Sequence, residues 1–278
     1  MPKGAALTIG LNAVDPKHYG GWSGELNACE ADANDMADIA KTAGFTVTKL
    51  LTKAGTRSRV IKEITNAAKS LKSGDIFMLT YSGHGGQLPD LNGDEADGED
   101  ETWCLYDGEL LDDEIYTLLG KFSAGVRILV FSDSCHSGTV LKVNFYPPAA
   151  PARAADGTSG EVRYRNMPTE VALRTYRDNK TFYDPILRDP KLKESRAAVK
   201  ASAILLSGCQ DNQLSQDGTF NGLFTGTMLR VWNGGKFKGN YRAFHKGIVS
   251  RMPPDQTSNF FRVGQLNSKF ESQSPFKI

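Results

Sequence analysis

The sequence of 278 residues predicts an α/β protein with a mostly parallel central sheet flanked by helices. Short apolar runs, such as residues 76–79 and 128–131, are typical of strands that are buried on both faces. Between such runs lie segments whose apolar residues recur at helical spacing. The links are short, which favours right-handed crossovers between parallel strands. We therefore expect one domain over residues 1–278, with an insertion at about 142–200.

Strand and helix signals alternate along the chain. Gly44 and Gly74 each follow a helical pattern, at the position where glycine commonly ends a helix. A Pro-rich and then Arg/Lys-rich composition interrupts the alternation at about 142–200. The expected elements are a strand at 5–11, a helix at 28–43, a strand at 45–51, a helix at 58–71, a strand from 75, an acidic loop at 88–101, a short strand at 103–106, a helix at 112–122, a strand from 127, a strand at 203–209, helices at 222–232 and 241–251, and a strand at 260–264.

Composition excludes several functional classes. Lys and Arg exceed Asp and Glu by 33 − 32 = 1, so no strong field recruits nucleic acid or an anionic membrane. We find no apolar run of about 18 residues, the length that a membrane span needs. The N-terminal apolar run is too short for a signal peptide. Scattered cysteines without a metal-binding spacing are expected to be reduced thiols of a cytoplasmic protein; they are Cys29, Cys104, Cys135 and Cys209.

Two residues with catalytic potential follow two of the buried strands. Cys135 comes after the run at 127–133, and His84 after the run at 75–82. In an open α/β sheet, ligands bind beyond the carboxyl ends of the strands, so the two residues are expected to meet there. His84 is then the base that activates the Cys135 thiol, and the N–H groups of Gly85 and Cys135 are the oxyanion donors. The adjacent His136 is expected to point away from Cys135.

The motifs around these residues resemble one known family. Residues 81–85 read Tyr-Ser-Gly-His-Gly and residues 133–138 read Asp-Ser-Cys-His-Ser-Gly. Together with residues 26–33, 100–102, 206–213 and 252–257, they resemble the metacaspases and their bacterial members, the orthocaspases. The resemblance implies a caspase-like (caspase-hemoglobinase) fold, a monomer, and a cysteine endopeptidase that forms a thioester acyl-enzyme.

The resemblance also implies a specificity. The aspartates that match Asp32 and Asp133 line the pocket that selects Arg or Lys in metacaspases. A buried carboxylate pair is costly without a cation, and a substrate guanidinium would relieve that cost. We therefore expect protein or peptide substrates with Arg or Lys at the cleavage site. For Asp211, which follows a later strand, a pocket role and a turn role both remain open.

The sequence favours calcium-independent activity over calcium dependence. The loop at 90–95 departs from an EF-hand because Glu95 stands where glycine is needed. Asp100, Asp112 and Asp113 match a calcium site that many metacaspases use. A further acidic ligand of that site falls on Lys142, whose positive charge opposes the ion. We expect no obligatory cofactor.

Several alternatives stay open. The segment at 142–200 is either a partly ordered surface insertion or an activation segment that the protein itself, or an upstream protease, cuts to activate a zymogen. A catalytically silent scaffold of the same fold is a rival to the peptidase. A thiol hydrolase acting on a small molecule is another. A nucleic-acid role of the insertion is weaker, because its basic residues are interleaved with few aromatic ones.

Overall fold

A computed structural model describes residues 1–93, 95, 98–134, 163–209, 215–254 and 256–278. Its strands and helices follow the expected order through most of the chain. They are β1 (Gly4–Gly10), α1 (Cys29–Thr42), β2 (Thr46–Leu51), α2 (Arg57–Ser70), β3 (Ile76–Ser82), β4 (Gly85–Pro89), β5 (Glu99–Leu105), β6 (Gly108–Leu111), α3 (Asp112–Leu119), β7 (Arg127–Asp133), α5 (Thr169–Asp178), α6 (Lys180–Leu187), β8 (Ser202–Ser207), α7 (Leu223–Trp232), α8 (Tyr241–Val249), β9 (Asn259–Gly264) and α9 (Ser268–Ser272).

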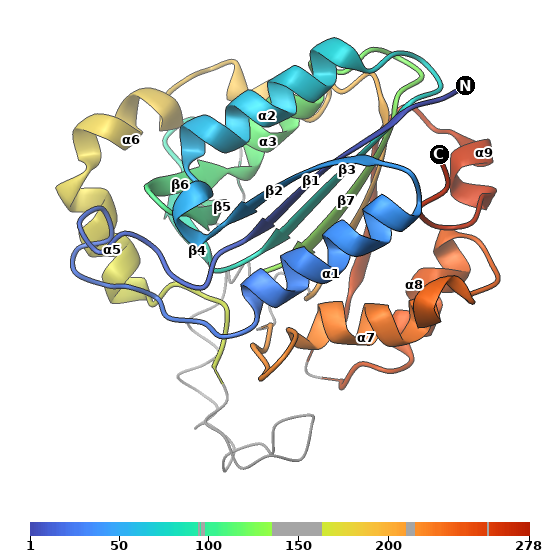
Figure 1. Cartoon of the computed structure of the whole chain (residues 1–278). Coiled ribbons are helices and arrows are strands. Elements are labelled where there is room, and N and C mark those ends of the chain that lie inside the picture. Colours follow the sequence, from blue (N-terminus) through green and yellow to red (C-terminus); the bar gives the residue numbers. More distant parts are fainter. Residues whose placement is uncertain (94, 96–97, 135–162, 210–214, 255) are drawn as a thin grey trace.

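The central sheet has the strand order β2-β1-β3-β7-β8-β9 (Figure 1). The first five strands of that order are parallel, and β9 pairs antiparallel with β8 at the edge. Strands β3 and β7 are neighbours at the centre, in a register that sets Ser82 beside Asp133. The predicted mostly parallel sheet is confirmed, and the two strands that precede His84 and Cys135 lie side by side within it.

Helices cover both faces of this sheet (Figure 1). Residues of α2 and α3 pack on one face, where Leu7 and Ile9 of β1 meet Val60 and Leu118. Residues of α1, α7, α8 and α9 pack on the other face. Because both faces are covered, every residue of β3 is buried, which explains the unbroken apolar run at residues 76–79.

A second, antiparallel sheet of β4, β5 and β6 lies at the carboxyl end of the central strands. The acidic loop expected at 88–101 is therefore wrong at both of its ends. Leu88 pairs with Asp100, and Pro89 with Glu99. Acidic residues disfavoured a strand in the sequence, but the backbone partner supplied by β4 outweighs that local preference.

The described part of the basic insertion, residues 163–200, is packed rather than loose. It forms α5 and α6, and Val171, Tyr183 and Leu187 are buried against the body of the protein. These residues are therefore ordered and partly buried, although most of their side chains are exposed or half-buried. The dense Arg and Lys residues concealed a narrow apolar stripe on each helix. Within the described residues, no helix combines the length and the apolar character that crossing a bilayer requires.

Candidate active site

The two predicted catalytic positions follow adjacent strands. His84 lies two residues beyond the end of β3, and Cys135 lies two residues beyond the end of β7 in the sequence. Cys135 and His136 are outside the described residues, so the geometry of the predicted dyad stays a prediction. The chain leading to Cys135 is well anchored, because the Ser132 hydroxyl accepts a hydrogen bond from the Trp103 indole at 3.2 Å and contacts the Ser134 hydroxyl at 3.0 Å.

His84 is buried and held from one side. Its Nε2 lies 3.0 Å from the Gly24 carbonyl oxygen, which can only accept, so Nε2 carries the proton. The other ring nitrogen, Nδ1, is buried without a hydrogen-bond partner among the described residues. Trp22 lies against the imidazole, with ring centres 4.7 Å apart. Burial lowers the pKa of His84 to about 4, so the ring is neutral at pH 7 and Nδ1 is available as a base.

Asp32 and Asp133, predicted as a pair, converge on one buried cation. The guanidinium of Arg165 lies 2.8 Å from Asp32 Oδ2 and 3.1 Å from Asp133 Oδ2. A third carboxylate, that of Asp217, lies 2.9 Å from the same group. Arg165 is completely buried. The protein therefore encloses one positive charge in a chamber of three carboxylates, which we call the acidic pocket (Asp32, Asp133 and Asp217).

Neutral donors also hold the carboxylates of the acidic pocket in place. The Ser82 hydroxyl donates to Asp32 at 2.7 Å, and the Thr225 hydroxyl and N–H donate to Asp133 at 2.7 and 3.0 Å. The N–H of Gly222, at the start of α7, donates to Asp32 at 3.1 Å. A Cβ at Gly222 would lie 2.5 Å from the Arg165 guanidinium, so only glycine leaves room for it. The pocket is thus preorganised for a planar cation.

Burial and charge act in opposite directions on Asp32. Removal from water raises the pKa of this carboxyl to about 6, although the Arg165 guanidinium and the Ser82 hydroxyl favour its ionised form. At pH 7 the Asp32 carboxyl is therefore mostly ionised. Below pH 6, protonation of Asp32 weakens the attraction for any cation in the pocket.

Gly85, the predicted oxyanion donor, lies beside the same arginine. Its N–H donates to the carbonyl oxygen of Arg165 at 2.9 Å. The Arg165 side chain thus lies in the acidic pocket, and the Arg165 carbonyl oxygen accepts from the N–H group that is predicted to bind an oxyanion. His84, Gly85, Asp32 and Asp133 are brought together around this one residue.

The residues predicted as calcium ligands are not gathered in this way. Asp113 Oδ1 accepts a hydrogen bond from the Ser195 hydroxyl at 2.8 Å, and the Asp90 carboxylate accepts three from N–H groups of its own loop. Among the described residues, no group of three or more His, Cys, Asp or Glu side chains is arranged to hold a metal ion. Asp112 begins α3, and Asp100 is buried in β5. Lys142 lies outside the described residues.

Sequence reasoning missed several residues of this site. Gly24, which orients His84 through its carbonyl, carries no side-chain signal. Arg165 and Asp217 were missed because long-range folding alone joins them to Asp32, across 133 and 185 residues of chain. Asp211, which was considered for the pocket, lies outside the described residues. Of the missed residues, Asp217 could have been suspected from the sequence, because Ser215-Gln216-Asp217 lies in the segment that follows a buried strand.

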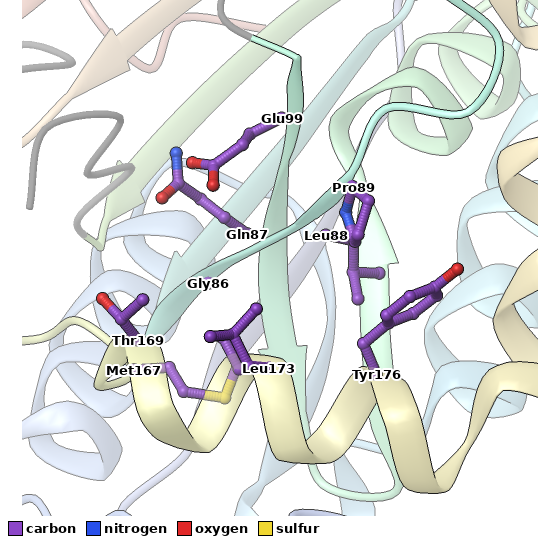
Figure 2. Close-up of a pocket in the computed structure, with 10 residues that line it drawn as sticks. Gly86, Gln87, Leu88, Pro89, Glu99, Met167, Thr169, Leu173 and Tyr176 are labelled. Carbon is purple, nitrogen blue, oxygen red and sulfur yellow. The ribbon is translucent and has the colours of Figure 1, made fainter.

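A pocket with an empty volume of about 480 Å³ adjoins Gly86 (Figure 2). Strand β4 forms one side of it, and Met167 with residues of α5, including Leu173 and Tyr176, forms the other (Figure 2). Met167 follows Arg165 by two residues. The pocket therefore lies on the carboxyl side of the arginine that fills the acidic pocket.

Similarities to known proteins agree with this geometry. Residues 3–275 match the family model for the caspase domain. Metacaspase-1 of Schizosaccharomyces pombe is 29% identical over 252 residues, which are 81% of this chain and 58% of that protein. Metacaspase-1 of Mycosarcoma maydis is 30% identical over 248 residues, which are 81% of this chain and 60% of that protein. The chain thus matches only about three fifths of these relatives' length.

Solved structures show the same architecture. The crystal structure of protein GSU0716 from Geobacter sulfurreducens is 64% identical, has a TM-score of 0.90, and matches 100% of this chain and 99% of that one. Caspase-1 from Spodoptera frugiperda is 13% identical with a TM-score of 0.55, over 95% of this chain and 86% of that one. At that identity the insect structure shows the fold alone, and it confirms the fold class that the sequence resemblance implied.

Proposed function

The chain belongs to the caspase-domain family, and on that premise we propose that it is a cysteine endopeptidase cutting proteins after Arg or Lys. In this mechanism Nδ1 of His84 removes the proton from the Cys135 thiol, and the thiolate adds to the substrate carbonyl carbon. The N–H groups of Gly85 and Cys135 bind the oxyanion. His84 then protonates the leaving amine, and water hydrolyses the thioester.

One observation supports the proposed specificity for Arg or Lys. The acidic pocket already holds an arginine guanidinium, fully buried and within 3.1 Å of all three carboxylates. Three carboxylates out of water favour a cation strongly and would reject an acidic side chain by repulsion. The Gly85 N–H donates to the Arg165 carbonyl oxygen at 2.9 Å, so a substrate Arg bound in the same way would have its carbonyl group at the oxyanion donor.

Matched fluorogenic peptides ending in Arg, Lys or Asp test this proposal, with Cys135→Ala as the control. We expect cleavage after Arg and Lys, none after Asp, and none by the control. Cleavage after Asp would contradict the role of Asp32 and Asp133. If no peptide is cut, before or after a limited digestion of the segment at 142–200, the chain is a catalytically silent scaffold.

The remaining properties are proposed on the same basis. We propose a zymogen, because an internal arginine occupies the pocket that a substrate needs. We propose a monomer, as the resemblance to metacaspases implies. We propose a reducing, cytoplasmic setting, since the described cysteines Cys29, Cys104 and Cys209 are free thiols. We propose that no metal is obligatory, so peptide cleavage should change less than about twofold in a chelator.

A further inference from the structure

We propose that the Arg165–Asn166 peptide bond is a self-cleavage site, with Arg165 bound to its own active site as the residue before the cut. This inference rests on the proposed function and specifies the bond on which it first acts. A cation in the acidic pocket alone does not require it, because a structural ion pair would fill the pocket equally well. The position of the backbone around Arg165 is what distinguishes the two.

The backbone before the bond pairs like an added strand. The Arg165 N–H donates to the Ser215 carbonyl at 2.9 Å, and the Asp217 N–H donates to the Arg163 carbonyl at 2.8 Å. Tyr164 and Gln216 form an antiparallel bridge between these two hydrogen bonds. Binding of an extended peptide by strand addition uses such main-chain bonds for affinity and a side-chain pocket for specificity. The segment at 163–165 has both.

The backbone after the bond is fixed as well. The Met167 N–H donates to the Gly85 carbonyl at 2.8 Å, while the Gly85 N–H donates to the Arg165 carbonyl. Gly85 therefore holds the chain on both sides of the Arg165–Asn166 bond. The Asn166 backbone also reaches the His84 ring, where it favours the protonated imidazole. The proposed acid–base residue thus lies beside Asn166, the residue whose nitrogen must receive a proton as it leaves.

Burial separates Arg165 from the other basic residues of this segment. Within the described residues 163–200, the remaining Arg and Lys side chains are exposed or half-buried, whereas Arg165 is completely buried. Arg163 lies two residues away, but its side chain is exposed and bonds to the Glu25 carbonyl. Composition alone offers many bonds for an Arg-specific protease; the fold presents one of them.

The reaction follows the proposed mechanism within one molecule. His84 takes the proton of the Cys135 thiol, and sulfur forms a bond to the Arg165 carbonyl carbon. Collapse of the oxyanion breaks the bond to the Asn166 nitrogen, which receives the proton from His84. Water, deprotonated by His84, then cleaves the thioester, and the thiol regains its proton. The products are residues 1–165 with a new carboxylate and residues 166–278 with a new amine.

The test follows the purified full chain over time by intact mass and N-terminal sequencing. We expect two fragments, the second beginning at Asn166, at a rate independent of protein concentration because the bond and the site share one molecule. Cys135→Ala should stay intact. The matched control is Arg177→Ala, which removes an exposed arginine of the same segment and should be cut like the wild type.

Two pocket variants separate a substrate from a structural ion pair. Arg165→Lys keeps the charge and should be cut at the same bond. Arg165→Gln removes the charge and should be cut at least about a hundredfold more slowly, because it leaves buried carboxylates unpaired. Peptide cleavage is measured on the same samples, and activity of Arg165→Gln toward Arg peptides shows that it has folded.

Different results would overturn the self-cleavage site and the proposed peptidase function. A wild type that cuts Arg peptides while its 165–166 bond stays intact, or that cuts itself only elsewhere, overturns the self-cleavage site and leaves the proposed function standing. A wild type that cuts neither itself nor any peptide overturns the proposed function, and the self-cleavage site with it.

Discussion

Two of the places where this protein buries acidic side chains neutralise them in different ways. The acidic pocket sets Asp32, Asp133 and Asp217 around the Arg165 guanidinium. Glu109 in β6 is equally buried, but its direct side-chain partner is the hydroxyl of Thr102 at 2.6 Å. The nearby Arg57 pairs with Glu114 instead, at 2.8 Å.

The two sites differ in what neutralises the buried carboxyl group. Burial raises the pKa of Glu109 to about 8, so at pH 7 this side chain holds a proton and carries no charge. In the acidic pocket a side chain from another part of the sequence supplies the positive charge. A proton can neutralise any buried carboxyl group. A guanidinium can do so only in a pocket of matching shape, whose carboxylates are held in place by neutral donors such as Thr225. The shaped chamber is typical of a binding site; the protonated glutamate is typical of a structural one.

Removing acid from the pocket should have the largest effect. We expect Asp133→Asn and Asp32→Asn to lower kcat/KM for Arg peptides by roughly 10²–10⁴-fold, which corresponds to the 3–5 kcal/mol lost when one partner of a buried ion pair is removed. Asp38→Asn is the matched control, since Asp38 is exposed on the same helix as Asp32. Unchanged kinetics in either pocket variant would contradict the pocket assignment.

Removing the cation should destabilise the fold. In a Cys135→Ala background, which prevents cutting, we expect Arg165→Ala to lower the free energy of unfolding by about 3–5 kcal/mol at pH 7. The deficit should shrink at pH 5, because an acid whose folded pKa is raised, as that of Asp32 is, destabilises less as pH falls below that pKa. Urea denaturation at both pH values measures it.

A small amidinium compound, whose planar cation resembles a guanidinium, extends the same experiment. Benzamidine should restore part of the stability of Arg165→Ala, because it binds the folded pocket and not the unfolded chain. Arg177→Ala, at the exposed arginine of α5, should unfold within about 0.5 kcal/mol of its parent. A deficit in Arg165→Ala that is equal at both pH values and insensitive to benzamidine would mean that lost packing, not charge, is responsible.

Glu109 should affect the free energy of unfolding over a different pH range. Because its folded pKa is raised, the folded state keeps a proton that the unfolded state releases above pH 4–5. This group alone should then lower the free energy of unfolding by about 1.4 kcal/mol per pH unit up to pH 8. Glu109→Gln should remove that slope. Parallel stability–pH curves for the variant and the wild type would contradict the protonated state.

The pH dependence of self-cleavage should report the charge of Asp32. This reaction takes place with Arg165 already bound, so its rate reports groups in the bound state. We expect the rate to fall about tenfold per pH unit below pH 6, as Asp32 becomes protonated, and to be level between pH 6.5 and 8. A decline that begins only near pH 4, the pKa of His84, would show that the charge of Asp32 does not limit the cut.

Much of the fold could be predicted because its central strands are buried on both faces. An unbroken apolar run such as 76–79 identifies β3 without reference to any other part of the chain. Because ligands bind at the carboxyl ends of such strands, the ends of β3 and β7 then identified His84 and Asp133 as candidate site residues. The pairing of β4 with acidic β5 was missed, because a strand held by its neighbour has no local signature.

The cation of the pocket was missed for a related reason. Arg165 stands among many exposed Arg and Lys residues, and nothing in its neighbours marks it as buried. Its partners come from α1, the end of β7 and the region before α7. A residue whose role depends on three distant segments becomes visible only when those segments are placed in space. The sequence did supply the charge of the pocket, through Asp32 and Asp133, but not its occupant.

The order of the central sheet gives the cut at Arg165 a lasting consequence. Strand β7 precedes the bond and β8 follows it, yet the two are hydrogen-bonded neighbours from Arg127–Ser202 to Ser132–Ser207. After the cut, one sheet is shared by two polypeptides that no peptide bond connects. Its unfolding then becomes a dissociation, so the melting temperature should rise with protein concentration where that of the intact chain does not. A single hydrolysis would change the molecularity of folding.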